Sequence, residues 1–339
     1  MTNKLTFAAI GLDHRHIYTQ AQNMMDVGGV FKGWWTEGEP QPLAGFKKRF
    51  PDVPRFEDRR ALLEDPEIDL IIIAGIPNER AAFAIEAMKH GKDVMTDKPG
   101  CTTLEQLAEI KKTVNKTNRI WSINFSERFE VPSVTKVTEL LAEGAIGQVV
   151  QTIGMGPHRL NKATRPDWFF EHEKYGGIIC DIASHQIDQF LAFTGSDNAT
   201  INFARVGNFT NPETPELEDF GEVSLSSELA SGYARVDWYT PDGLPTWGDG
   251  RIFILGTEGT IEMRKYCDVG RNAQLDNIIL TNGSRCEYID GRDAGLPYFK
   301  NFADDILNRT ETAMRQSHAF KVTELTLMAQ KIANRGKVD

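Results

Sequence analysis

The sequence predicts an α/β protein whose first part forms a doubly wound parallel sheet and whose second part forms an α+β domain. Short apolar stretches alternate with amphipathic ones through the first 125 residues, which is the pattern of successive βαβ units. Between residues 200 and 289, strand-like stretches separated by turn residues dominate. They predict an open mixed sheet that is mostly antiparallel.

The alternation defines the elements of the first domain. The unbroken apolar run Leu70–Gly75 suits a parallel strand that is covered on both faces. The segment Thr102–Gln106 contains a capping box, in which a threonine and a glutamine satisfy the first backbone amides of a helix. We predict strands at 5–10, 30–36, 70–75, 93–96 and 120–124, and helices at 16–25, 43–50, 58–64, 80–90 and 102–115.

The regular alternation of strand and helix patterns ends after Phe125. We therefore place a boundary there and expect domains at 1–125 and 126–339. The C-terminal helix, within 317–334, could pack back on the N-terminal domain. We predict helices at 133–143, 177–194, 298–308 and 317–333, and strands at 222–226, 232–239, 251–255, 260–263 and 277–280.

Composition excludes several classes of protein. The net charge of −10 argues against nucleic acid or an anionic membrane as a partner. No apolar run approaches the ~20 residues of a membrane helix, and Met1–Lys4 leads into an apolar strand without a secretory signal pattern. The four cysteines show neither paired nor metal-ligand spacing, so we expect a cytoplasmic protein without a metal site.

The turn Gly11–His16 follows the first strand, where a dinucleotide fingerprint would read G-x-G-x-x-G. Only Gly11 fits, because Asp13 and His16 occupy the later glycine positions. Asp13 could cap the next helix and leave His14 and the helix N-terminus facing an anion. An ordinary strand-to-helix turn is the alternative. A His-x-His pair is also typical of metal-dependent (β/α)8 hydrolases, but the strand-rich second half argues against that fold.

Two further segments fit the edge of a cofactor site. Glu37 follows the second strand, where a carboxylate would bond the ribose hydroxyls of NAD and repel the 2′-phosphate of NADP. A solvated loop acid is the alternative. Pro77 and Asn78 end the buried strand in a turn that suits a cofactor edge, although turn chemistry alone also explains them.

Lys98 lies in the run Asp97-Lys98-Pro99-Gly100, directly after an apolar strand. Ligands of doubly wound sheets bind at the C-terminal ends of strands. A lysine fixed there by a proline turn could stabilise negative charge on a reacting oxygen. The alternative is an ordinary surface lysine in a turn.

Asp181 and His185 are spaced to share one face of an otherwise apolar helix that follows Gly176-Gly177. A buried carboxylate and imidazole need partners or a cavity, and together they could perform acid/base chemistry. A structural hydrogen-bonded pair is the alternative. Arg128 begins the second domain, and the long irregular stretch Gly156–Tyr175 contains His158, Arg159, Arg165 and Trp168. These residues suggest substrate contacts or a lid, with surface salt bridging as the alternative.

Taken jointly, the Pro77-Asn78 turn, the Asp97-Lys98-Pro99 motif, Arg128, and the glycine pair before Asp181 and His185 resemble the Gfo/Idh/MocA family of oxidoreductases. The resemblance covers nearly the whole chain. It implies an N-terminal Rossmann domain that binds NAD, with NADP as the alternative. It also implies a C-terminal domain that binds substrate and associates through its open sheet into a homodimer or homotetramer.

The same resemblance implies oxidation of a secondary alcohol on a sugar, cyclitol or related polyol. Lys98 would contact the reacting hydroxyl, His185 would be the acid/base, and Asp181 would bind substrate or orient His185. The cofactor would be held by Gly11, Asp13, His14, Glu37, Pro77, Asn78, Asp97 and Lys98. Two other functions stay open: a lyase or glycosidase that oxidises its substrate transiently with bound NAD, and a non-catalytic dinucleotide-binding sensor.

Overall fold

The computed structural model describes residues 4–271 and 274–336. Two compact units make up the chain, and each is described by itself. The first unit comprises Met1–Asn124, Glu173–Gly176 and Pro297–Thr323. The second unit comprises Phe125–His172, Gly177–Leu296 and Glu324–Asp339.

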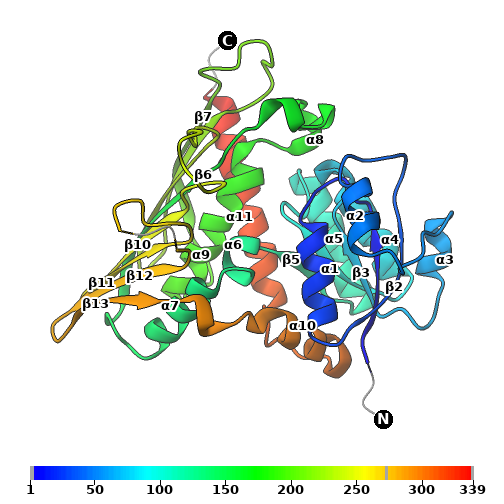
Figure 1. Ribbon diagram of the computed structural model, residues 1–339, viewed down its shortest axis with the longest axis horizontal. Coiled ribbons are helices and arrows are strands. Elements are labelled where there is room, and N and C mark those ends of the chain that lie inside the picture. The colour runs from blue at the N-terminus through cyan, green and yellow to red at the C-terminus, as the bar shows by residue number, and fades with distance from the viewer. Residues whose placement is uncertain (1–3, 272–273, 337–339) are drawn as a thin grey trace. The chain divides into compact units, whose positions relative to one another are not determined.

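The first unit is built on a five-stranded parallel sheet in the order β2-β1-β3-β4-β5 (Figure 1). An isolated parallel bridge between Trp34 and Arg55 adds one more contact beyond β2. The direction of winding reverses between β1 and β3, which is where doubly wound sheets bind ligands. The strands are β1 (Thr6–Ile10), β2 (Val30–Trp35), β3 (Leu70–Ile73), β4 (Asp93–Asp97) and β5 (Trp121–Asn124).

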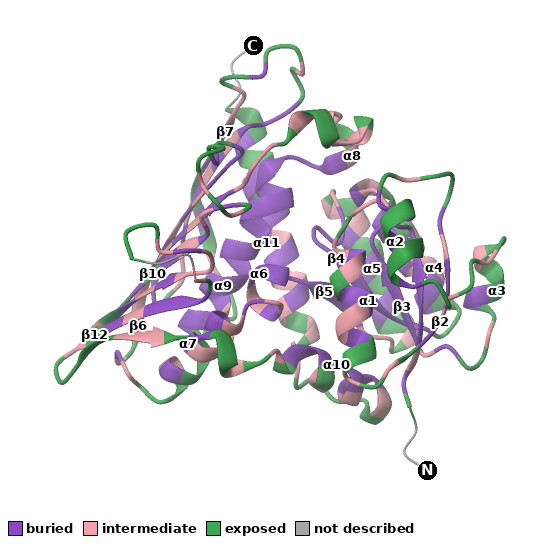
Figure 2. Cartoon of the chain, in the orientation of Figure 1, coloured by how far each residue is buried: buried purple, intermediate pink, exposed green. Residues whose placement is uncertain are grey.

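Helices cover this sheet because its strands are apolar on both faces. Every residue of β3 and β4 is buried, as Figure 2 shows in purple. Helices α4 and α5 pack on each other, and α1 contacts β2, β3 and α10. The helices are α1 (Ile17–Asp26), α2 (Leu43–Arg49), α3 (Arg59–Leu63), η1 (Pro77–Glu79), α4 (Arg80–Lys89), α5 (Leu104–Thr117), α8 (His172–Tyr175) and α10 (Pro297–Asn308). The predicted capping box is confirmed, with Thr103 and Gln106 bonding reciprocally.

The second unit contains an eight-stranded sheet in the order β13-β12-β11-β10-β6-β9-β8-β7. Only the β6–β9 pair is parallel, so the predicted mixed and mostly antiparallel sheet is confirmed. The strands are β6 (Val149–Pro157), β7 (Thr200–Gly207), β8 (Phe220–Ser226), β9 (Ser231–Asp237), β10 (Arg251–Gly256), β11 (Gly259–Arg264), β12 (Asn277–Asn282) and β13 (Cys286–Asp290).

One face of this sheet carries the unit's core. Helix α9 packs on β6 and β9, and α7 packs on β11 and β12. The elements of this unit are α6 (Ser126–Phe129), α7 (Pro132–Ala142), η2 (Lys162–Thr164), η3 (Asp167–Phe170), η4 (Ile179–Ala183), α9 (Ser184–Thr194) and η5 (Arg292–Ala294). The long α11 (Gln316–Arg335) begins in the first unit, and its residues from Glu324 onward belong to the second. Within the described residues, no helix has the length and apolarity to cross a membrane.

The structure corrects several predicted elements. The helix predicted from residue 177 begins instead with η4, a π-helical turn, which leads into α9. Strands β6, β7 and β13 and the short helix α6 were not predicted. Gly154 and Gly156 weaken the strand signal of β6, because glycine has no side chain to pack. In the structure both glycines admit the side chain of Gln186, which a Cβ would meet at 2.7 and 3.0 Å.

Candidate functional site

Gly11 closes β1 at the reversal point of the first sheet. Its φ is +74°, a conformation that favours glycine. A Cβ placed there would lie 2.7 Å from the Cα of Gly75, so the ends of β1 and β3 can approach this closely only without one. This turn keeps the part of a dinucleotide fingerprint that depends on close backbone approach.

Asp13 does not cap α1, so the capping prediction is wrong. The N-cap residue is His16, and it makes no side-chain capping bond. Asp13 is half-buried, and burial together with the charges of Glu79 and Glu37 raises its pKa to about 6, against a lowering by Arg80. Three carboxylates thus influence one another at the ends of β1, β2 and β3.

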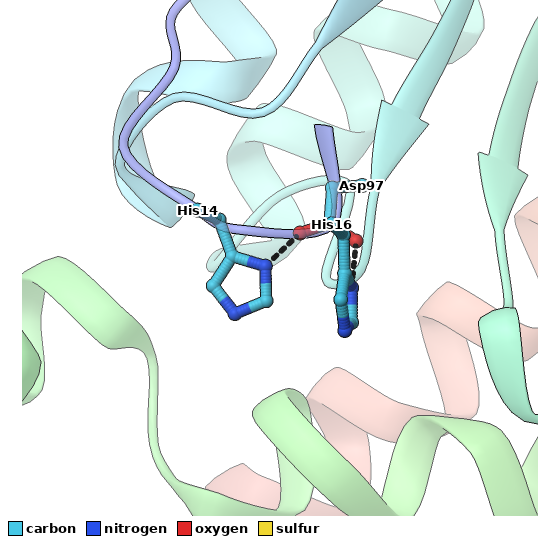
Figure 3. Close-up of side chains that lie close together, drawn as sticks. All are labelled: His14, His16 and Asp97. Carbon is cyan, nitrogen blue, oxygen red and sulfur yellow. Dashed lines mark hydrogen bonds and ion pairs between the residues drawn. The ribbon is translucent and has the colours of Figure 1, made fainter. Parts of the chain in front are cut away.

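Asp97, at the end of β4, holds the β1–α1 turn (Figure 3). Its Oδ2 lies 2.8 Å from His14 Nδ1, and its Oδ1 lies 2.8 Å from His16 Nδ1. Oδ1 also accepts hydrogen bonds from the Lys98 amide at 2.9 Å and from Gln20 Nε2 at 3.3 Å. The carboxylate is fully buried, with 0% of its side chain exposed.

These contacts determine the charges at the turn. Burial opposes ionisation of Asp97, but His16, His14 and Arg80 hold its pKa well below the usual range. Burial, reinforced by His16, lowers the pKa of His14 to about 4. At neutral pH His14 is therefore uncharged and its Nδ1 faces a carboxylate.

Arg80, which the sequence analysis did not single out, fixes the segment around Lys98. It is fully buried at the start of α4, and its Nη2 lies 3.3 Å from Asp97 Oδ2. Its guanidinium also donates to the carbonyls of Gly75 at 2.8 Å, Pro99 at 3.1 Å and Lys98. Lys98 is buried, with 6% exposed, and its bond to Pro99 is cis. The sequence showed only that an arginine follows the Pro77-Asn78 turn by two residues, and its burial is known from the structure.

The other residues predicted to bind cofactor lie at neighbouring strand ends of the first unit. Glu37 is exposed directly after β2. Pro77 is the buried first residue of η1, and the carbonyl of Asn78 accepts a hydrogen bond from Gln106 Nε2 at 2.8 Å. Because the carboxyl ends of parallel strands share one edge of a sheet, these residues lie on the same edge as Gly11 and Lys98.

Asp181 and His185 lie in the second unit, on η4 and α9 respectively, and only 9% and 2% of them is exposed. The ring of His185 lies edge-on to Phe125 at 6.3 Å. Gly177, with φ +94°, packs so closely that a Cβ would lie 2.3 Å from the Gln330 side chain. Gln330 in turn accepts from the Ile179 amide at 3.0 Å. The absence of a side chain at Gly177 thus lets the Gln330 side chain of α11 pack close to the backbone. Gln330 then holds the start of the π-helical turn through its hydrogen bond with Ile179.

Arg128 is engaged by a buried partner. Its Nε and Nη2 donate to the two oxygens of Asp188 at 2.6 and 2.7 Å, and the Asp188 side chain is 0% exposed. Its guanidinium also lies over the Phe129 ring at 4.3 Å. A bidentate pair of this kind orients α6 on α9 and gives the buried Asp188 carboxylate its partner.

Glu127 is a second residue that the sequence analysis missed. It is buried, and its Oε1 lies 2.6 Å from Lys265 Nζ and 4.0 Å from His158 Nε2. Burial would raise its pKa, but the charges of Lys265, His185 and His158 lower it to about 2. The pKa of Lys265 is raised by Glu127 against the effect of burial. Glu127 and Lys265 lie far apart in sequence, so no local pattern pairs them.

The remaining candidates for substrate contact are tied to nearby loops. Arg159 donates from Nη2 to the carbonyls of Pro241, Leu244 and Thr246 at 2.9, 2.7 and 3.2 Å. Arg165 donates to the Leu160 carbonyl at 2.8 Å and lies over the ring of Phe169 at 4.3 Å. Trp168 is half-buried in η3. These contacts give both arginines a part in shaping the loops.

The structure therefore brings the candidates together in two sets. In the first unit, His14 and the Lys98 amide meet at the Asp97 carboxylate, and Gly11 lies on the same edge of the sheet. In the second unit, Arg128, His158 and His185 lie around Glu127, Asp188 and Phe125.

Comparison with known proteins identifies the class of the fold and site. The family model described as "Oxidoreductase family, NAD-binding Rossmann fold" matches residues 36–125, and the "GFO/IDH/MocA C-terminal domain" matches residues 134–262. The first unit is thus the NAD-binding domain of an oxidoreductase. The chain belongs to the Gfo/Idh/MocA family.

A crystal structure from Erwinia carotovora atroseptica SCRI1043, described as an oxidoreductase, is similar over 98% of this chain and 99% of that one. It has a TM-score of 0.95 and 45% identity. A structure of levoglucosan dehydrogenase with NADH and levoglucosan, covering 98% of each chain, has a TM-score of 0.78; at 18% identity it supports the fold alone.

Among curated proteins, scyllo-inositol 2-dehydrogenase (NAD(+)) of Bacillus subtilis (strain 168) is 27% identical over 208 residues. The match spans 60% of this chain and 58% of that enzyme. D-xylose dehydrogenase of Paenarthrobacter nicotinovorans is 28% identical over 38% of this chain and 34% of its own length. The matches thus span well under two thirds of these relatives.

Proposed function

We propose that the protein is an NAD-dependent dehydrogenase that oxidises a secondary alcohol of a sugar, cyclitol or related polyol. The observation that carries the proposal is the placement of Lys98. It leaves the C-terminal end of β4 beside the reversal point of an NAD-binding sheet, held by Asp97 and Arg80. The named dehydrogenases among the similar proteins support the substrate class.

The residues of the first unit fit a bound dinucleotide in part. The Gly11 turn allows close backbone approach, and Glu37, Pro77 and Asn78 lie on the same sheet edge. Asp13 is the exception, because its carboxylate would oppose a pyrophosphate. In this proposal residues 1–125 bind the cofactor and 126–339 bind the substrate, with NADP as the alternative cofactor.

When bound, nicotinamide would supply the hydride acceptor. We propose that His185 takes the hydroxyl proton of the substrate, and that the Lys98 ammonium stabilises the developing alkoxide. Asp181, four residues before His185, would orient it or bind a substrate hydroxyl. Lys98→Ala and His185→Ala should each lower turnover by roughly 10²–10⁴-fold. Near-unchanged turnover in either folded variant would remove that residue from the chemistry.

The first experiment is titration of the purified protein with NADH and NADPH separately, following quenching of tryptophan emission. Trp35, half-buried at the end of β2, is the reporter. Tight NADH binding with weak NADPH binding supports the assignment of Glu37, and Glu37→Ala should then narrow the difference. If neither binds and the purified protein carries no cofactor, the dehydrogenase proposal is withdrawn. If NADH binds, sugars and cyclitols are screened for reduction of NAD.

We also propose a cytoplasmic homodimer or homotetramer. The sheet face opposite the core residues Ile252 and Ile254 carries large exposed side chains, among them Phe253 and Leu255 at 38% and 44% exposure. Exposed apolar side chains grouped on one sheet face mark an association surface. Sedimentation analysis of the wild type and of Phe253→Lys tests this. A monomeric wild type would contradict it.

A further inference from the structure

Two imidazoles and a carboxylate meet on the β1–α1 turn of the first unit. The rings of His14 and His16 lie perpendicular with centroids 4.2 Å apart, and one ligand atom from each of His14, His16 and Asp97 lies within 4.8 Å of the others. The imidazole side chains are 21% and 30% exposed, whereas Asp97 is fully buried behind them. The two imidazoles are thus partly accessible to solvent, whereas the carboxylate is not.

The hydrogen bonds determine which ring nitrogens are available. Asp97 Oδ1 already accepts hydrogen bonds from the Lys98 amide and from Gln20, so its 2.8 Å hydrogen bond with His16 needs a proton on Nδ1. We infer the same tautomer for His14, whose Nδ1 lies 2.8 Å from Asp97 Oδ2. A neutral imidazole has one ring proton, so Nε2 then carries the lone pair. Figure 3 shows both Nε2 atoms on the side of the rings that points away from the carboxylate.

We propose that His14 and His16 bind a divalent first-row transition-metal ion, such as zinc, through their Nε2 atoms. Asp97 acts behind them as the carboxylate that orients both rings and strengthens them as donors, an arrangement common in metal sites. Two ligands at ~2.0–2.1 Å in tetrahedral geometry stand about 3.3 Å apart. The ring centroids lie 4.2 Å apart, and binding would require the rings to rotate until their Nε2 atoms reach that spacing. Water or a small-molecule oxygen completes the coordination.

Charges of both signs surround the two histidines, and Lys98 acts on His14 with its positive charge. Asp13, next to His14, experiences the negative charges of Glu37 and Glu79. Arg80 is engaged by Asp97 and three carbonyls on the buried side. Imidazole ligands select ions such as zinc, nickel, copper and iron over magnesium or calcium. The inference does not rest on the proposed dehydrogenase activity, because it concerns the chain without substrate or dinucleotide.

The test uses the full-length protein after treatment with a chelator. Zinc is titrated by calorimetry, and cobalt(II) by visible absorption, whose bands report the coordination. The expected result is one ion per chain. His14→Ala and His16→Ala should each weaken binding at least tenfold, while His90→Ala, an exposed histidine of the same unit, should change nothing. No binding, or binding that survives in both variants, would overturn the proposal.

A second measurement separates a built site from an adventitious histidine pair. Nitrogen-15 spectra of histidine side chains should show His14 and His16 protonated at Nδ1 without metal, with only Nε2 shifting on addition of zinc. Asp97→Asn, if folded by circular dichroism, should weaken zinc binding by roughly 10–100-fold. Protonation at Nε2 in the metal-free protein would contradict the inferred arrangement even where the variant does not fold.

Discussion

Arg80 and Asp97 form an ion pair that is withdrawn from solvent, with Nη2 and Oδ2 3.3 Å apart and side chains 1% and 0% exposed. The pair touches the ends of three strands. Asp97 contacts His14, which follows β1. Arg80 donates to the carbonyls of Gly75, after β3, and of Lys98, after β4. One charged pair therefore connects the candidate cofactor turn with the backbone of Lys98.

Removal of Arg80 should destabilise the protein by about 3–5 kcal/mol, because a buried carboxylate loses its cation. Arg80→Lys should be intermediate, since an ammonium cannot reproduce the planar set of carbonyl contacts. Urea unfolding measures both variants. Arg59→Ala, at a 37% exposed arginine paired with Glu86, is the control and should cost under about 1 kcal/mol. Equal costs at the two positions would show that the buried pair is not stabilising.

Gly11→Ala should destabilise by at least about 2 kcal/mol, from a positive φ and a Cβ contact of 2.7 Å with Gly75. Gly91→Ala is a matched control, because Gly91 has φ +79° but open space around its Cβ position. It should cost only the backbone strain, about 1 kcal/mol. Thermal unfolding of both variants separates the two effects. If the two variants lose equal stability, the strands β1 and β3 can move apart to accommodate the added methyl group without a loss of unfolding free energy.

Arg128→Ala should lower the free energy of unfolding by about 3 kcal/mol, because Asp188 would be left buried without its bidentate partner. The double variant Arg128→Leu/Asp188→Leu should recover part of that loss. Chemical denaturation gives the coupling energy. A variant that keeps full stability but has a raised KM on a verified substrate would instead assign Arg128 to substrate binding.

Glu127 should make stability depend on pH in the acid range. Its pKa is about 2 in the folded protein against a usual 4.5, so the folded state favours the charged form. The associated stability is present above pH ~4.5 and lost as the pH falls toward 2. Glu127→Gln should cost up to about 3 kcal/mol at pH 7, with the difference from wild type narrowing below pH ~4.5. A difference that stays constant with pH would mean that the carboxylate charge has no part.

The fold was largely predictable because its signals are local. Unbroken apolar strands such as Leu70–Ile73, amphipathic helices and the Thr103 cap each lie within a few residues of sequence. The misses have physical reasons as well. The glycines of β6 weaken the sequence pattern of a strand that is stabilised by its neighbouring strands. A π-helical turn does not follow the 3.6-residue period by which a helix is recognised in a sequence.

The sequence predicted several residues of the candidate site, but it did not predict which residues contact one another. Lys98, His185 and Gly11 could be named from strand ends and helix faces. The ion pairs of Arg80 with Asp97, Glu127 with Lys265 and Arg128 with Asp188 join residues 17, 138 and 60 positions apart. Pairing at such separations is a property of tertiary structure, so sequence spacing predicted neither Arg80 nor Glu127.

The π-helical turn Ile179–Ala183 has a consequence for comparison between relatives. A π turn holds about one residue more than an α turn over the same length of helix axis. A relative whose helix is regular here would be one residue shorter within 179–183. An alignment that places this gap before residue 179 would pair Asp181 with a residue that is not its structural equivalent, although His185 would still be matched correctly. Such an alignment would misjudge which relatives have both the aspartate and the histidine.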